Sequence, residues 1–150
     1  MKASTRRLAT AARLLLGLIF TVFGLNGFLN FIPQPPMPPD AIVVVTGLLG
    51  MKYFFPLLKG VEVVSGLLLL TGRFVPLVLV VLAPIVLNIV GFHTFVVPDP
   101  VMPILVLLPE LYLAWVWREA YRPLFTRTAP PAVQAAAAVE AGLQARFGRV

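Results

Sequence analysis

The sequence predicts an all-α membrane protein: a bundle of four transmembrane helices with a short interfacial or re-entrant helix between the first two spans. Three properties of the chain predict this class, since 59% of its 150 residues are hydrophobic, only 12% are charged, and the mean hydropathy is +0.95. Soluble domains are about 45–50% apolar and about 25% charged, so this chain has too few charged residues to cover a globular surface. A single integral membrane domain is therefore expected.

Four apolar runs predict the spans of this domain, which we assign to residues 1–127. The first run covers residues 14–32. Its basic leader is not followed by an A-x-A-like cleavage site, so we expect a retained span and not a cleaved signal peptide. The other runs cover residues 54–72, 74–98 and 101–117. Each run approaches the roughly 20 apolar residues that a helix needs to cross a bilayer.

Two further segments are not expected to span. Residues 41–50 are apolar but too few to cross a bilayer, and they follow the stretch PQPPMPPD, whose prolines cannot continue a helix. We expect them to form a short lid helix at the outer membrane surface. Residues 128–150 form an alanine-rich tail, expected to be a loose helix at the cytoplasmic surface that Gly142 interrupts.

The basic residues predict the orientation of the chain. Four precede the first span, Arg73 lies between the second and third spans, and five follow the fourth, whereas the opposite side has Lys52. Because Lys and Arg concentrate in cytoplasmic segments, both termini are expected to be cytoplasmic. This placement explains the net charge of +6 by membrane topology, so no nucleic-acid partner is expected.

The composition excludes several kinds of chemistry. The chain has no cysteine, which removes disulfide relays, thiolate nucleophiles, iron–sulfur clusters and cysteine-bound zinc. With His93 as its single histidine, one chain cannot hold a bis-histidine haem. Two carboxylates and His93 are three potential metal ligands, but no pair of them has the close spacing along a helix that favours a site. We predict no metal.

Polar residues inside the spans are the candidate functional site. From a rise of about 1.5 Å per residue, Lys59 lies about 7 Å and Glu62 about 12 Å below the outer end of the second span. Glu110 lies about 13 Å below the outer end of the fourth. A charge near the bilayer centre costs at least about 2.5–3.5 kcal/mol, so these groups are expected to face inward and to find partners. They predict a polar chamber that opens outward.

Within this chamber we expect Lys59 to pair with Glu62. Glu110 should then be the carboxyl group that exchanges a proton, with His93 as its relay to the outer solvent. Lys59 could instead extend to the outer headgroups while its stem covers apolar surface.

Asparagines add amides to the predicted chamber. Asn26 and Asn30 lie four residues apart and should share one face of the first span. Asn88 and His93 are about 140° apart around the third span and should flank its inward arc. The asparagines of the first span could instead serve as interhelical hydrogen bonds. The predicted ligand-binding residues are Lys59, Glu62, Asn88, Asn26 and Asn30.

Three segments of the chain resemble the DoxX-like family of small bacterial membrane proteins: ARLLLGLIFTVFGLNGFL, YFFPLLKGVEVVSGLLLLTGRFVPLVLVVLAPIVLNIVGFH and ELYLAWVWREAYRPL. The resemblance covers about residues 12–125, with KGVE in the second span, N-x4-H in the third and a mid-span glutamate in the fourth. This family is similar to the DoxD/DoxA type of thiosulfate:quinone oxidoreductase subunit. The resemblance implies the bacterial inner (plasma) membrane, a redox accessory role, and quinone or sulfur-compound chemistry.

Three functions remain open at this point. In a redox accessory, a quinone would enter the chamber, and His93 and Glu110 would bind its carbonyl oxygens. In a protein that binds or transports a small solute or an ion, Glu62 and Glu110 would be the binding carboxylates, and four spans would require a homo-oligomer. In a structural assembly subunit the polar groups would only fix helix register. The chain has no cofactor fingerprint, so electrons would arrive through a quinone or a redox partner.

Overall fold

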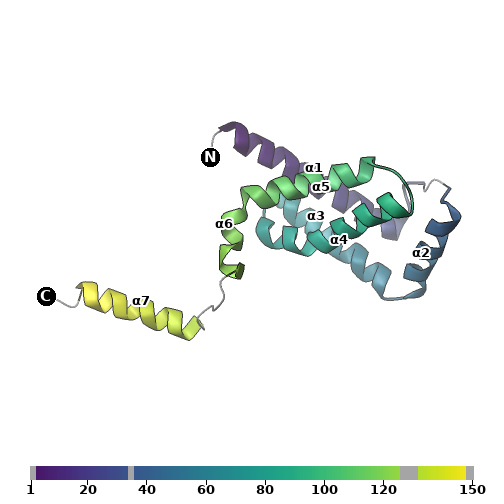
Figure 1. The fold of residues 1–150 in the computed structure, drawn as a ribbon. Helices are drawn as coiled ribbons and strands as arrows, with labels where there is room; N and C mark the ends of the chain where they lie inside the picture. Colours follow the sequence, from purple (N-terminus) through teal and green to yellow (C-terminus); the bar gives the residue numbers. More distant parts are fainter. Residues whose placement is uncertain (1–2, 34–35, 126–131, 148–150) are drawn as a thin grey trace. The chain divides into compact units, whose positions relative to one another are not determined.

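The computed structural model of the chain describes residues 3–33, 36–125 and 132–147, and every regular element in these residues is a helix (Figure 1). The chain divides into two compact units, Met1–Arg118 and Glu119–Val150, which are described separately. The elements are α1 (Ala3–Leu29), α2 (Pro39–Gly50), α3 (Phe54–Thr71), α4 (Val75–Phe95), α5 (Val101–Val116), α6 (Arg118–Tyr121), the 3-10 helix η1 (Arg122–Phe125) and α7 (Ala132–Phe147).

Four helices of the first unit form a bundle (Figure 1). Around it, α1 packs on α3, α3 on α4, α4 on α5, and α5 on α1. The contact between α1 and α3 is the most extensive of these, and that between α3 and α4 is the smallest. Because each of these helices has two neighbours in this order, α3 and α5 occupy diagonal positions. α2 is a separate short helix that contacts α3.

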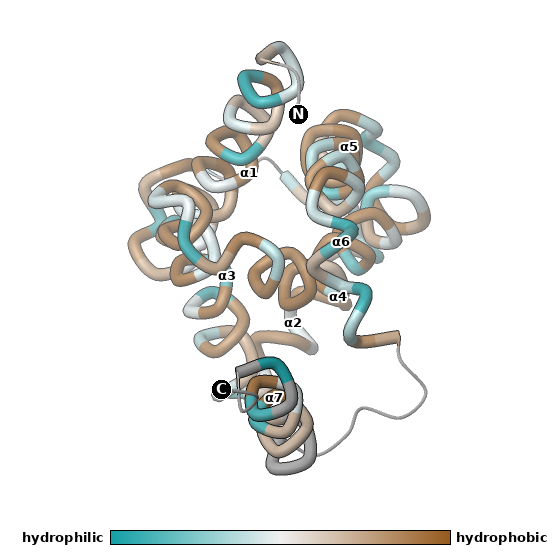
Figure 2. Tube along the Cα trace, turned by 90° about the vertical axis from the view of Figure 1, so that its left-hand side faces the viewer, coloured by the Kyte–Doolittle hydropathy of each residue, from teal (hydrophilic) through white to brown (hydrophobic). Residues whose placement is uncertain are grey.

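Three helices of the described residues, α1, α3 and α4, are long and apolar enough to cross a membrane. The fourth apolar helix, α5, reaches this length only together with the segment Arg118–Phe125, from which it is separated by a sharp bend. α2 is apolar but shorter. Hydrophobic colouring extends along all of these helices in Figure 2. The described part of the chain therefore has the all-α character and the long apolar helices predicted for a membrane protein.

The helix bounds agree with the predicted spans at α3, α4 and α5 to within a few residues. The helix that contains the first predicted span, α1, does not have the bounds 14–32: it begins at Ala3, inside the basic leader, and ends at Leu29. It ends there because Asn30 adopts a left-handed backbone conformation with φ 49°. Such a residue commonly terminates a helix, and asparagine tolerates the conformation better than most residues.

Small residues allow α1 and α3 to approach closely. A Cβ atom added at Gly17 would lie 3.0 Å from the carbonyl oxygen of Gly66. One added at Gly66 would lie 2.6 Å from the backbone nitrogen of Thr21. Such close approach of backbones is typical of packing between membrane helices. The core of the bundle is apolar, and its largest fully buried side chains are Phe20, Leu16, Leu69, Leu82, Leu113, Val86 and Val106.

The C-terminal end of α3 is capped by a basic side chain from α1. The Arg13 guanidinium donates hydrogen bonds to the carbonyl oxygens of Leu69 and Leu70, the latter at 3.0 Å. Gly72 follows with φ 72°, a conformation that favours glycine at this position. A cation near unpaired carbonyl groups at a helix C-terminus is stabilising. Arg13 is one of the four basic residues that precede the first predicted span, and its place in the sequence does not indicate this contact.

The second unit contains one long helix, α7, which runs without a break from Ala132 to Phe147. The prediction that Gly142 interrupts this helix is wrong. A single glycine costs an exposed helix only about 1 kcal/mol relative to alanine, and the surrounding residues of α7 are mostly strong helix formers.

Candidate functional site

Lys59 and Glu62 form the ion pair predicted from their spacing on α3. Lys59 Nζ lies 2.8 Å from Glu62 Oε2, and the two side chains are 19% and 6% exposed. Their separation of three residues places both on one face of the helix. The pairing is therefore confirmed, and each charge has its compensating partner inside the bundle.

Glycines of α1 make room for this ion pair. A Cβ atom at Gly27 would lie 2.6 Å from Cδ of Lys59. The lysine stem therefore packs on α1 at a position that has no side chain. A Cβ atom at Gly24 would lie 3.1 Å from Cβ of Glu62. The Lys59 ammonium also lies 5.7 Å from the centre of the Phe55 ring, within the range of a cation–π contact. The pair is thus held between α1 and α3.

Glu110 is the second buried carboxyl group of the bundle. It is 5% exposed on α5, and its Oε2 atom is buried with no hydrogen-bond partner in the part of the chain that the structure describes. Pro109 precedes it, and a proline inside a helix leaves the carbonyl oxygen four residues earlier, that of Leu105, without its usual donor. The unpaired carboxyl oxygen therefore lies where the regular hydrogen bonding of α5 is interrupted.

His93 does not contact Glu110 through a hydrogen bond. Its Nδ1 atom donates to the carbonyl oxygen of Ile89 at 2.9 Å, one turn earlier on α4. Its ring meets the Phe92 ring edge-on, with 5.5 Å between the ring centres. The structure therefore records no direct hydrogen bond for the predicted relay from Glu110 through His93.

The two carboxyl groups lie on helices that are diagonal in the bundle. Glu62 is on α3, next to α1, whereas Glu110 is on α5, which packs on α1 and α4. The groove between α3 and α4, with a volume of about 450 Å³, is lined by Ser65 and by apolar residues and glycine, and neither carboxyl group is among them. No three His, Cys, Asp or Glu side chains within the described ranges are placed to hold a metal ion.

The predicted inward face of Asn26 and Asn30 is not formed. Asn26 is buried, but its Oδ1 atom accepts a hydrogen bond of 2.7 Å from the backbone nitrogen of Ile32 and so closes the end of α1. Asn30 lies beyond the last residue of α1 and is exposed. The helix ends one residue before Asn30, whose left-handed backbone turns its side chain away from the face of Asn26.

Asn88 also lies elsewhere than predicted. It is exposed on the surface of the bundle and does not flank the inward arc of α4. The inward arc is set by Val75, Val78, Leu79, Leu82 and Val86, which are buried. Two residues beyond Val86, a helix has turned by about 200°, so Asn88 points away from the core.

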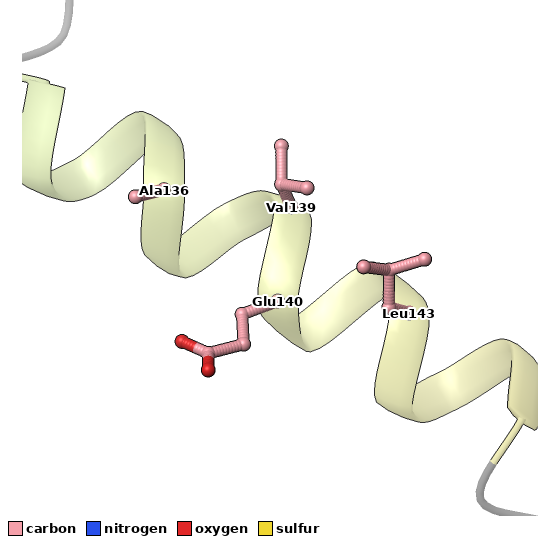
Figure 3. Close-up of a pocket in the computed structure, with 4 residues that line it drawn as sticks. All are labelled: Ala136, Val139, Glu140 and Leu143. Carbon is pink, nitrogen blue, oxygen red and sulfur yellow. The ribbon is translucent and has the colours of Figure 1, made fainter.

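A shallow hollow on α7 was not predicted. It is lined by Ala136, Val139, Glu140 and Leu143, all from this one helix (Figure 3). Val139 and Leu143 project from one side of the helix and Glu140 from another, and all four residues are exposed. A hollow with one wall does not enclose a ligand, so the candidate site remains in the first unit.

Comparison of the chain with family models, curated proteins and solved structures gave no match. The functional argument consequently rests on the residues themselves: a satisfied ion pair between α1 and α3, and a separate buried carboxyl group on α5.

Proposed function

We propose that the chain is a multi-pass protein of the bacterial inner membrane with four spans, α1, α3, α4 and α5. The length and apolar character of the first three helices support this count, as does the apolar α5 with its bent continuation. In this arrangement α2 lies at the outer surface of the membrane, because its 12 residues are too few to cross a bilayer.

We expect both termini to be cytoplasmic, because ten basic residues flank the spans on that side and one on the other. Reporter fusions after Asp40 and after Asp99 should therefore report the outer side. A matched fusion after Arg73 should report the cytoplasm. A cytoplasmic signal from Asp40 or Asp99 would contradict the proposed orientation.

We further propose that the protein is an accessory of a membrane redox system, in which Glu110 exchanges a proton with a quinone bound in the bundle. The observation that carries this proposal is the buried Oε2 atom of Glu110 without a partner. A carboxylate left unpaired in apolar surroundings is costly, so such a group takes up a proton or binds a ligand that supplies a donor. The resemblance to DoxX-like proteins supports quinone as that ligand.

The chemistry required of the chain is limited to hydrogen bonding and the transfer of one proton. Reduction of a quinone to the quinol consumes two electrons and two protons. Glu110 would supply one proton, and a redox partner must supply both electrons and the second proton, because the chain has no cysteine to hold an iron–sulfur cluster. Protonated Glu110 would donate to one quinone oxygen and lose its proton there. Opening of α5 near Pro109 would admit the ring, since a proline weakens the helix at this point.

Binding of a solute or ion between two carboxylates is supported less well. That alternative requires Glu62 as well as Glu110, and Glu62 is already compensated by Lys59 at 2.8 Å. A new cation would have to displace the lysine. Glu110 alone is left to bind a ligand, which suits a neutral molecule with hydrogen-bond acceptors better than an ion.

Substitution of Glu110 separates proton transfer from binding. Glu110→Gln should retain the quinone, since the amide still donates a hydrogen bond, but it should abolish proton exchange. Glu110→Leu should lower the amount of copurifying quinone by about 2- to 10-fold, the value of one hydrogen bond. Quinone content of the detergent-purified protein and redox-induced infrared difference spectra of the carboxyl band measure the two effects.

The exposed Glu140→Gln on α7 is the matched control and should change neither measurement. Purified wild-type protein without quinone would contradict the proposal. An unchanged carboxyl band in Glu110→Gln would assign proton exchange to another group.

A further inference from the structure

The outward face of α4 carries a regular stripe of residues, of which Leu77 and Val81 also border the groove between α3 and α4. The residues of the stripe recur at alternating intervals of four and three, which is the heptad spacing of helices that pack along each other. The stripe consists of Leu77, Val81, Pro84, Asn88, Gly91 and Phe95.

Five of the six residues of this stripe are exposed, and Gly91 is half-buried. The exposed fractions are 60% for Leu77, 40% for Val81 and 85% for Phe95, and Asn88 is exposed between them. A Cβ atom added at Gly91 would meet no other atom within 4 Å, so this glycine opens a gap on the surface of the helix. The buried arc of α4 is a different set of residues, which already binds the helix to the bundle.

Asn88 is the polar member of the stripe. Its side chain makes no hydrogen bond to any described residue of the chain. Asn88 lies about 10 Å from the outer end of α4, at a depth where a lipid chain offers neither donor nor acceptor. A carboxamide both donates and accepts hydrogen bonds, so it is complementary to a second carboxamide.

We infer that this stripe binds a second copy of the chain, in a symmetric dimer with α4 packed against α4 of the partner subunit. A twofold axis along the membrane normal places identical residues at identical depth, so Asn88 meets Asn88 of the partner subunit. Each amide then donates to the other, and both are satisfied. Gly91 lets the two helices approach closely at the next position.

Self-association explains the stripe better than the other occupants. Lipid chains would cover the apolar positions but leave the amide unsatisfied. A different membrane protein would need a polar group at the depth of Asn88, whereas a second copy always has one. The inference rests on the placement of α4 in a membrane and is independent of Glu110 and of quinone.

Single cysteines provide the test, because the natural chain contains none. In liposomes, Val81→Cys and Phe95→Cys should crosslink to dimers, whereas Leu108→Cys, which is 59% exposed on α5, should not. Asn88→Leu should weaken dimerisation about 5- to 30-fold, the value of an interhelical hydrogen bond between membrane helices. Asn88→Gln should retain most of the association.

Circular dichroism of each variant verifies that the helices are formed. The proposal is overturned if the wild-type chain is monomeric in liposomes, if Leu108→Cys crosslinks as readily as Val81→Cys, or if Asn88→Leu dimerises as tightly as the wild type. Crosslinking of Val81→Cys to another protein in the native membrane, without a homodimer, would also overturn it. Quinone content should be unchanged in Asn88→Leu, so this result and that for Glu110 are separable.

Discussion

Replacement of Glu62 by glutamine should destabilise the bundle by about 3 kcal/mol. The substitution keeps the size of the side chain but removes the charge that compensates Lys59, and loss of one partner from a buried ion pair typically costs about 3–5 kcal/mol. We expect the lower end of this range because the Lys59 side chain is 19% exposed, so its charge is only partly buried. Unfolding of the detergent-solubilised protein in a graded denaturing detergent measures the difference.

A double substitution distinguishes the charge effect from a packing effect. In Lys59→Met with Glu62→Met, no charge is left without a partner, so the free energy of unfolding should return close to the wild-type value. Apolar replacements of buried ion pairs are often neutral or stabilising. Equal loss of stability in Glu62→Gln and in the double variant would show that the ion pair contributes through its shape alone.

The ion pair could be predicted from the sequence because the information is local. Two opposite charges three residues apart on one helix lie on the same face, whatever that helix packs against. Burial of the pair also followed from the sequence, because charged groups in an apolar span must avoid lipid. The glycines of α1 that accommodate the lysine stem were not assigned this role, since nothing in the sequence indicates which residues of α1 lie opposite Lys59.

The side of α4 on which Asn88 lies could not be predicted, because it depends on contacts between helices and not on local spacing. α4 is apolar around its whole circumference, so its hydrophobic pattern does not indicate which side faces the core. The spacing of Asn88 and His93 fixed the angle between them but not the orientation of either. Only the packing of α4 on α3 and α5 determines that Val86 is buried and Asn88 exposed.

The relation between Glu62 and Glu110 was predicted only in part. Counting residues from the helix ends places both at similar depth, because depth along a straight helix follows from its rise per residue. The order of helices around the bundle does not follow from such a count. With α3 and α5 on a diagonal, equal depth alone does not bring the two carboxyl groups together. The structure pairs Glu62 with Lys59, whereas Oε2 of Glu110 has no hydrogen-bond partner among the described residues.

Replacement of Gly66 by valine should destabilise the bundle by about 3 kcal/mol or more, at the upper end of the cost of overpacking. A Cβ atom at this position would lie 2.6 Å from the backbone nitrogen of Thr21 and 2.8 Å from the carbonyl oxygen of Gly17, and closer still to the Thr21 hydroxyl. The hydroxyl can rotate away, but two of these atoms belong to the backbone of α1. α1 would have to move away from α3 along the most extensive helix contact of the bundle.

Gly60→Val is the matched control, since it places the same side chain on the same helix. A Cβ atom at Gly60 meets nothing within 4 Å, so this variant should stay within about 0.5 kcal/mol of the wild type. The two variants should therefore differ by at least about 2 kcal/mol in denaturing detergent. Equal stability of the two would contradict the close approach of α1 and α3. Because the same approach holds the stem of Lys59 against Gly27, Gly66→Val should also loosen the ion pair, whereas Gly60→Val should leave it intact.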